Sequence, residues 1–163
     1  GKIKPKTINK DIITNIDFAP TILEIADIDL PESIQGKSFL KNLTENENDN
    51  WRQSMYYHYY EYPYYHHVQP HYGIRNERYK LIHFYYDIDV WELYDLKKDP
   101  NELNNLFYSD KYKDLAVELK QELYELKKQY GNKLSLDEMK EISDTDFGGL
   151  ESNKGKKLQK NSN

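Results

Sequence analysis

The sequence contains no cysteine, which excludes disulfide bonds, thiolate metal ligands and a cysteine nucleophile from this chain. Residues 1–150 contain no block of basic side chains, and the formal net charge is -5. Because nucleic acid binding requires clustered Lys and Arg, we expect no nucleic acid partner. No apolar run is long enough to cross a bilayer, so we also expect no membrane span.

The start of the sequence also lacks two features. Gly1 stands where an initiator Met is usual, and no apolar stretch resembles a signal peptide. We therefore expect the chain to be an internal piece of a longer polypeptide. Its hydrophobic fraction of 37% is low but sufficient for a modest core.

Tyrosine and histidine are concentrated in residues 56–81, which hold all but one of the five histidines. Tyrosine offers a flat apolar face and a hydroxyl, and imidazole offers a donor, an acceptor or a cation near neutral pH. Such a cluster suits a polar, ring-shaped or anionic ligand. We expect this segment to form the functional surface.

The first part of the chain predicts a short helix and then a linker. Asp17 can cap a helix with Pro20 in its first turn. The buried side of this helix is expected to consist of Ile22, Leu23 and Ala26. Residues 44–50 are polar and turn-rich, which indicates a surface linker. We therefore predict a first unit that covers residues 1–45.

The second part predicts an antiparallel sheet and one long helix, together covering residues 46–132. The four expected strands cover Trp51 to Tyr62, residues 72–75, residues 79–85 and Val90 to Tyr94. A helix from about Lys111 to Tyr130 carries an apolar stripe, with Ser109 or Asp110 as N-cap and Gly131 as C-terminal stop. It should lie across one face of the sheet. Residues 133–163 lose periodicity, and we expect a disordered tail.

Several short motifs occur in an order that is typical of one enzyme family. They are residues 14–21 (TNIDFAPT), 35–40 (QGKSFL), 56–67 (YYHYYEYPYYHH), 71–81 (HYGIRNERYKL), 91–96 (WELYDL) and 99–102 (DPNE). In this order the chain resembles the C-terminal part of a bacterial formylglycine-dependent sulfatase of family S1. That group includes N-acetylglucosamine-6-sulfatase-like and N-sulfoglucosamine sulfohydrolase-like enzymes.

The resemblance implies an α/β, alkaline phosphatase-like sulfatase fold. This chain would hold only the end of the large domain and a small C-terminal subdomain of about four antiparallel strands packed against a long helix. The family hydrolyses sulfate esters of sulfated carbohydrates such as glycosaminoglycans or mucins. Its formylglycine nucleophile and Ca²⁺ site would lie upstream of this chain, in a missing N-terminal catalytic domain. The resemblance also implies a periplasmic or extracellular location.

The resemblance assigns substrate contacts, but no catalytic or metal-binding residue, to this chain. His66 and His71 match the family pattern Glu-Tyr-Pro, two residues, His, followed by His-Tyr-Gly, an aliphatic residue and Arg. Arg75 and Tyr65 complete the expected contacts with a sulfated carbohydrate.

The residues alone leave other interpretations open. His66, His67 and His71 also fit a metal cluster or a plain loop surface, and Arg75 also fits an ion pair with Glu61. A non-catalytic carbohydrate-binding module and a part of a related phosphoesterase remain alternative functions.

Overall fold

The computed structural model describes residues 3–45, 50–62 and 67–144, and the chain divides into two compact units, Gly1–Met55 and Tyr56–Asn163. The division lies later than the predicted boundary at residue 45. Trp51 explains part of this difference, because its indole Nε1 donates to the carbonyl oxygen of Ile12 at 2.9 Å. None of the helices in these ranges has the length and apolar character needed to cross a membrane.

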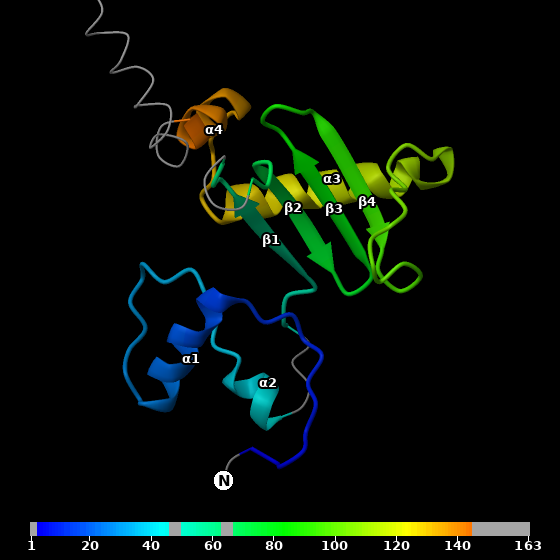
Figure 1. The fold of residues 1–163 in the computed structure, drawn as a ribbon. Coiled ribbons are helices and arrows are strands. Elements are labelled where there is room, and N and C mark those ends of the chain that lie inside the picture. Colours follow the sequence, from blue (N-terminus) through cyan, green and yellow to red (C-terminus); the bar gives the residue numbers. More distant parts are fainter. Residues whose placement is uncertain (1–2, 46–49, 63–66, 145–163) are drawn as a thin grey trace, which may run out of the picture. The chain divides into compact units, whose positions relative to one another are not determined.

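The first unit contains a 3-10 turn η1 (Asn15–Asp17) and two short helices, α1 (Phe18–Ile25) and α2 (Leu40–Thr44) (Figure 1). Asp17 is fully buried and organises the start of α1. Its carboxylate accepts hydrogen bonds from the backbone of Thr14 at 2.8 Å and of Lys37 at 3.0 Å. A single buried carboxylate thus connects two segments that are distant in the sequence.

The predicted buried side of α1 is wrong. Ile22 is 63% exposed and Ala26 is exposed, whereas Pro20 and Thr21 are buried. The Thr21 hydroxyl donates to the carbonyl of Asp17 at 2.7 Å and accepts from the amide of Phe39 at 3.0 Å. Helix α1 therefore packs within this unit through Pro20 and Thr21, with Leu23 half-buried, and Ile22 remains exposed.

The second unit is built on a four-stranded sheet in the order β1-β2-β3-β4, in which each strand runs opposite to its neighbour (Figure 1). The strands are β1 (Ser54–Tyr59), β2 (His71–Asn76), β3 (Tyr79–Phe84) and β4 (Val90–Asp95). The predicted meander is confirmed, although β1 is shorter than the predicted strand from Trp51 to Tyr62. The register places Gly73 opposite Ile82 and Arg75 opposite Lys80.

The long helix α3 (Lys113–Gln129) follows the 3-10 turn η2 (Asp110–Tyr112) and crosses one face of the sheet (Figure 1). Ser109 is the N-cap of η2 without a side-chain capping bond, and the N-cap of α3 is Tyr112 rather than the predicted Ser109 or Asp110. Gly131 follows the helix with φ +75°, a conformation that glycine adopts without steric cost. The core of the unit consists of Tyr72, Ile74, Leu81, Tyr85, Leu93, Ala116, Leu119, Leu123 and Met139.

Part of the expected disordered tail is ordered. Helix α4 (Leu136–Ile142) begins with a capping box in which Ser135 and Glu138 satisfy each other's backbone amides. Met139 holds the helix to the core and is fully buried. Residues 145–163 lie outside the described residues.

Candidate functional site

The two faces of the sheet have different neighbours. Tyr72, Ile74, Leu81 and Leu93 pack with α3 and α4 in the core. Side chains alternate between faces along a strand, so the intervening residues point to the opposite face, which we call the open face. The open face consists of Tyr57, Tyr59, His71, Gly73, Arg75, Lys80, Ile82, Phe84, Glu92 and Tyr94. On this face Gly73, Ile82 and Tyr94 are buried and Arg75 is exposed.

His71 stands at the start of β2 on the open face, half-buried among aromatic rings. Its Nδ1 lies 2.8 Å from the carbonyl oxygen of Gln69. The ring stacks on Tyr59 with centroids 5.5 Å apart and lies 5.0 Å from the ring of Phe84. Burial lowers the pKa of His71, although the Gln69 carbonyl opposes this shift. The imidazole is thus held in a fixed orientation and favours its neutral form.

Tyr57 fills the space above Gly73, beside His71. A Cβ placed on Gly73 would lie 2.6 Å from the Tyr57 hydroxyl oxygen and 2.5 Å from the carbonyl oxygen of Leu81. The Tyr57 ring meets the His71 ring edge-on at 5.9 Å. Its hydroxyl is buried, and the described residues offer it no hydrogen-bond partner. Burial raises the pKa of Tyr57, so the phenol stays protonated.

Arg75 lies on the same strand and the same face as His71, with its side chain exposed. The alternative ion pair with Glu61 is not formed among the described residues, where Glu61 accepts a bond from the Tyr59 hydroxyl at 3.4 Å. Its neighbour Lys80 is paired with Glu102 at 2.6 Å. The Arg75 guanidinium is therefore placed to bind an external anion.

His71 and Arg75 are four residues apart in one strand. At about 3.3 Å per residue their Cα atoms are separated by roughly 13 Å. One small ligand group that lies close to the strand backbone therefore cannot contact both side chains. They are suited to different parts of one extended ligand.

The other predicted contact residues fall outside this description. Tyr65 and His66 lie in residues 63–66, which are not among the described residues. His67 is exposed and adopts φ 49°, in a loop rather than in the sheet. Within the described ranges, no group of three His, Cys, Asp or Glu side chains could hold a metal ion.

The remaining two histidines belong to the core side of the sheet. His58 Nε2 shares a hydrogen bond with the Tyr85 hydroxyl at 2.9 Å. His83 Nδ1 shares one with the Tyr72 hydroxyl at 2.8 Å, and its Nε2 lies 2.6 Å from Asp89. Burial lowers the pKa of both imidazoles. These two histidines have structural roles. The Tyr- and His-rich segment that the sequence predicts to be functional, residues 56–81, therefore contributes to both faces of the sheet.

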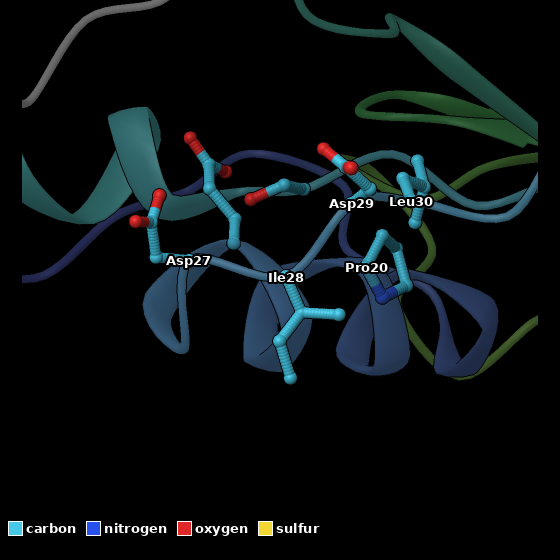
Figure 2. Close-up of a pocket in the computed structure, with 7 residues that line it drawn as sticks. Pro20, Asp27, Ile28, Asp29 and Leu30 are labelled. Atoms are coloured by element: carbon cyan, nitrogen blue, oxygen red, sulfur yellow. The ribbon is translucent and has the colours of Figure 1, made fainter.

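A separate cavity of about 300 Å³ lies beside α1 in the first unit. Its lining consists of Pro20, Glu24, Asp27, Ile28, Asp29, Leu30 and Ser38. In Figure 2, Asp27 and Asp29 direct their carboxylates to the same side, and Ile28 points away from them. Three carboxylates repel a sulfate or any other anion, so this cavity does not fit an anionic ligand.

Tyr57 and Gly73 are the site residues that the sequence analysis did not identify. Alternation along a strand places Tyr57 and Tyr59 on one face, but alternation alone gives no reason to prefer that face for binding. Gly73 inside a strand was the available signal, because such a glycine often marks a close approach of another group.

Comparison with known proteins gives this site a family context. A family model for the C-terminal region of N-sulphoglucosamine sulphohydrolase matches residues 1–129. An N-acetylglucosamine-6-O-sulfatase of Bacteroides thetaiotaomicron is 51% identical over 131 residues, which cover 78% of this chain and 23% of the relative. An arylsulfatase of Clostridium perfringens is 34% identical over 69% of this chain and 22% of its own length.

The fold leads to the same group. A solved structure of a protein in complex with its substrate D-glucosamine-2-N,6-O-disulfate matches with TM-score 0.78 and 47% identity, over 80% of this chain and 27% of that chain. The chain therefore spans about a quarter of the length of these relatives. The predicted resemblance and the predicted fold class are both confirmed.

Proposed function

This chain belongs to the N-sulphoglucosamine sulphohydrolase C-terminal family, and we propose from this membership that it forms the C-terminal part of a carbohydrate sulfatase. The full-length enzyme would hydrolyse sulfate esters of glycosaminoglycan or mucin sugars. A 6-sulfated amino sugar is the favoured substrate, since a relative with 51% identity is an N-acetylglucosamine-6-O-sulfatase.

The role of this chain is to contact the sugar. The observation that carries the proposal is the open face, where His71 has a fixed orientation and Arg75 has an exposed guanidinium. An imidazole can hydrogen-bond ring hydroxyls, and the Arg fork can bind a sulfate or carboxylate. By the family pattern, His66 and Tyr65 would join them from the adjoining loop.

The nucleophile and the metal would come from outside this chain. The sequence has no cysteine from which to form formylglycine. The described residues contain no group that could hold a metal ion. Formylglycine would supply a nucleophile for sulfur, and Ca²⁺ would stabilise the developing charge. This chain would instead bind and orient the sugar.

A preceding catalytic domain is the proposed intramolecular partner. The relatives have about four times the length of the matched part, and α1 exposes apolar side chains such as Phe18 and Ile22. An exposed apolar helix side is typical of a surface that packs against another domain. For the full-length enzyme we propose a periplasmic or extracellular location, where sulfated polysaccharides are found.

The test uses the full-length enzyme and two substrates, D-glucosamine-6-sulfate and a small aryl sulfate. His71→Ala and Arg75→Ala should lower kcat/KM on the sugar, each by roughly five-fold to a hundred-fold, because each removes a hydrogen bond or charge contact. The aryl sulfate should be hydrolysed as before. Lys97→Ala serves as the control, because its side chain is exposed and pairs with Glu77 rather than lying on the open face.

The alternatives make different predictions. Equal losses on both substrates would mean that these residues support the reaction centre or the fold. Unchanged turnover of the sugar would show that the open face does not contact it.

A further inference from the structure

The hydrogen bond of His71 to Gln69 determines which imidazole nitrogen carries the proton. A backbone carbonyl oxygen can only accept, so Nδ1, at 2.8 Å from the Gln69 oxygen, must be the donor. In the neutral ring the other nitrogen, Nε2, then holds a lone pair. None of the described residues hydrogen-bonds to Nε2, so this lone pair is available as an acceptor.

The surroundings of His71 favour the neutral ring. Burial and the ammonium group of Lys80 lower the pKa of His71, and together they outweigh the Gln69 carbonyl and the Glu92 carboxylate, which raise it. The groups that face the ring from β1 are the phenols of Tyr57 and Tyr59. Burial raises the pKa of both phenols, so neither is an anion near neutral pH.

Aromatic packing prevents the ring from turning over to exchange the two nitrogens. Tyr59 covers one side of the imidazole, and Phe84 and Tyr57 contact it from two other directions. Tyr57 can take this place because Gly73 has no side chain. The direction of the Nε2 lone pair is thus fixed by the sheet itself.

We propose that His71 Nε2 is a hydrogen-bond acceptor that selects a hydroxyl on the sugar and rejects a sulfate ester at the same position. A sulfate offers only acceptor oxygens, which would face the nitrogen lone pair without a proton between them. This inference rests on the proposed function, because it assumes that His71 contacts the sugar. It adds which substitution pattern of the sugar is accepted there.

The first test reads the tautomer directly by nitrogen NMR of the imidazoles in the 163-residue chain. We expect the His71 resonances of a neutral ring with its proton on Nδ1 at pH 7, assigned by their loss in His71→Gln. A proton on Nε2, or a charged ring at pH 7, would overturn the proposal.

The second test measures selectivity in the full-length enzyme with D-glucosamine-6-sulfate and with glucosamine 6-sulfates that carry a further sulfate at N2 or O3. The wild type should discriminate against the added sulfate at O3, which removes a hydroxyl donor, and not against the one at N2, which keeps an N–H. Equal turnover of all three sugars by the wild type would overturn the proposal. His71→Lys replaces the acceptor by a cationic donor, so it should reduce that discrimination by roughly ten-fold or more. His71→Gln keeps an amide oxygen as a possible acceptor and should preserve more of it.

The outcomes separate this inference from the proposed function. Equal loss by His71→Lys on all three sugars, with the aryl sulfate unaffected, would overturn the acceptor role but retain the sugar contact. No change on any sugar in His71→Ala would instead reject the contact itself.

Discussion

Arg52 and Asp17 form a buried, two-pronged ion pair in the first unit. Arg52 Nη2 donates to Asp17 Oδ1 at 2.7 Å, and Nη1 donates to Oδ2 at 2.5 Å. The Asp17 side chain is fully buried, and that of Arg52 is 8% exposed. Burial alone would raise the pKa of Asp17, but the bonds from Arg52, Lys37 and Thr14 lower it overall. The pair connects the end of the first unit to the start of α1.

Arg52→Ala should strongly destabilise the first unit, because it leaves the Asp17 carboxylate buried and uncompensated. Removal of one partner of a buried ion pair costs about 3–5 kcal/mol. Urea unfolding followed by Trp51 fluorescence measures the change. Lys97→Ala is the control, since its pair with Glu77 is exposed and should change stability by no more than about 0.5 kcal/mol. Similar effects of the two substitutions would contradict the role assigned to Arg52.

Ile22→Ser should affect the isolated chain and the full-length enzyme differently. Ile22 is 63% exposed in this chain, so the substitution should change the stability of the isolated chain by less than about 0.5 kcal/mol. If a preceding domain covers α1, the same change should cost about 2–5 kcal/mol in the full-length enzyme, because it removes a buried aliphatic side chain. Thermal unfolding of both proteins measures the difference.

Leu123→Ala provides the comparison for this experiment. Leu123 is fully buried in the core of the second unit, so its truncation should destabilise both proteins by about 2–5 kcal/mol. Equally small effects of Ile22→Ser in both proteins would show that α1 has no intramolecular partner.

The stability of the second unit should fall as the pH is lowered from 7 to about 4. Burial, with smaller contributions from Lys127 and His71, lowers the pKa of His58 to about 3. An unfolded histidine has a pKa of about 6.5. Between these values the unfolded chain binds a proton that the folded chain does not, so the free energy of unfolding decreases as pH falls. Urea midpoints at pH 7, 6, 5 and 4 measure this decrease.

His58→Gln should reduce this pH dependence without abolishing it, because the pKa of buried His83 is also lowered. Asp17 and Asp89 have lowered pKa values, so their contribution is lost only below the ordinary range of a carboxyl group, near pH 4. A urea midpoint that is constant from pH 7 to 5 in the wild-type chain would contradict the role of His58.

Local sequence patterns predicted most of the sheet and the long helix. The period of two along a strand puts Tyr56 and His58 on one face of β1 and Tyr57 and Tyr59 on the other, and the contacts agree. The patterns did not indicate which face packs against α3, because both faces are aromatic. The tertiary contacts of the sheet with α3 were needed to identify the face that is left for ligand binding.

Two predictions, the buried side of α1 and the disordered tail after residue 132, were wrong for physical reasons. Apolar periodicity in α1 predicted a buried side, but Ile22 is 63% exposed in this structure. Helix α4 was missed because it is short, although Leu136, Met139 and Ile142 recur every three residues and the Ser135–Glu138 spacing of a capping box was present in the sequence. One buried side chain, Met139, was enough to hold it.

The isolated 163-residue chain should show no sulfatase activity. It has no cysteine to convert to formylglycine, and no serine begins the short Pro and Arg motif that the family requires. Burial lowers the pKa of His71 and favours its neutral ring, and the contact with Gln69 places the ring proton on Nδ1, which suits binding better than attack on sulfur. Incubation with a chromogenic aryl sulfate and with sulfated disaccharides, in the presence of Ca²⁺, should give turnover no higher than the buffer.

The full-length enzyme prepared in the same way is the positive control for this assay. A chain that only contacts the sugar lowers the barrier by orienting a substrate for groups held elsewhere, so without those groups its contacts give binding and no reaction. Turnover that survives repurification and increases in proportion to the concentration of the chain would show that a nucleophile lies within these residues. Loss of that turnover in His71→Ala would then identify the open face as the reaction site.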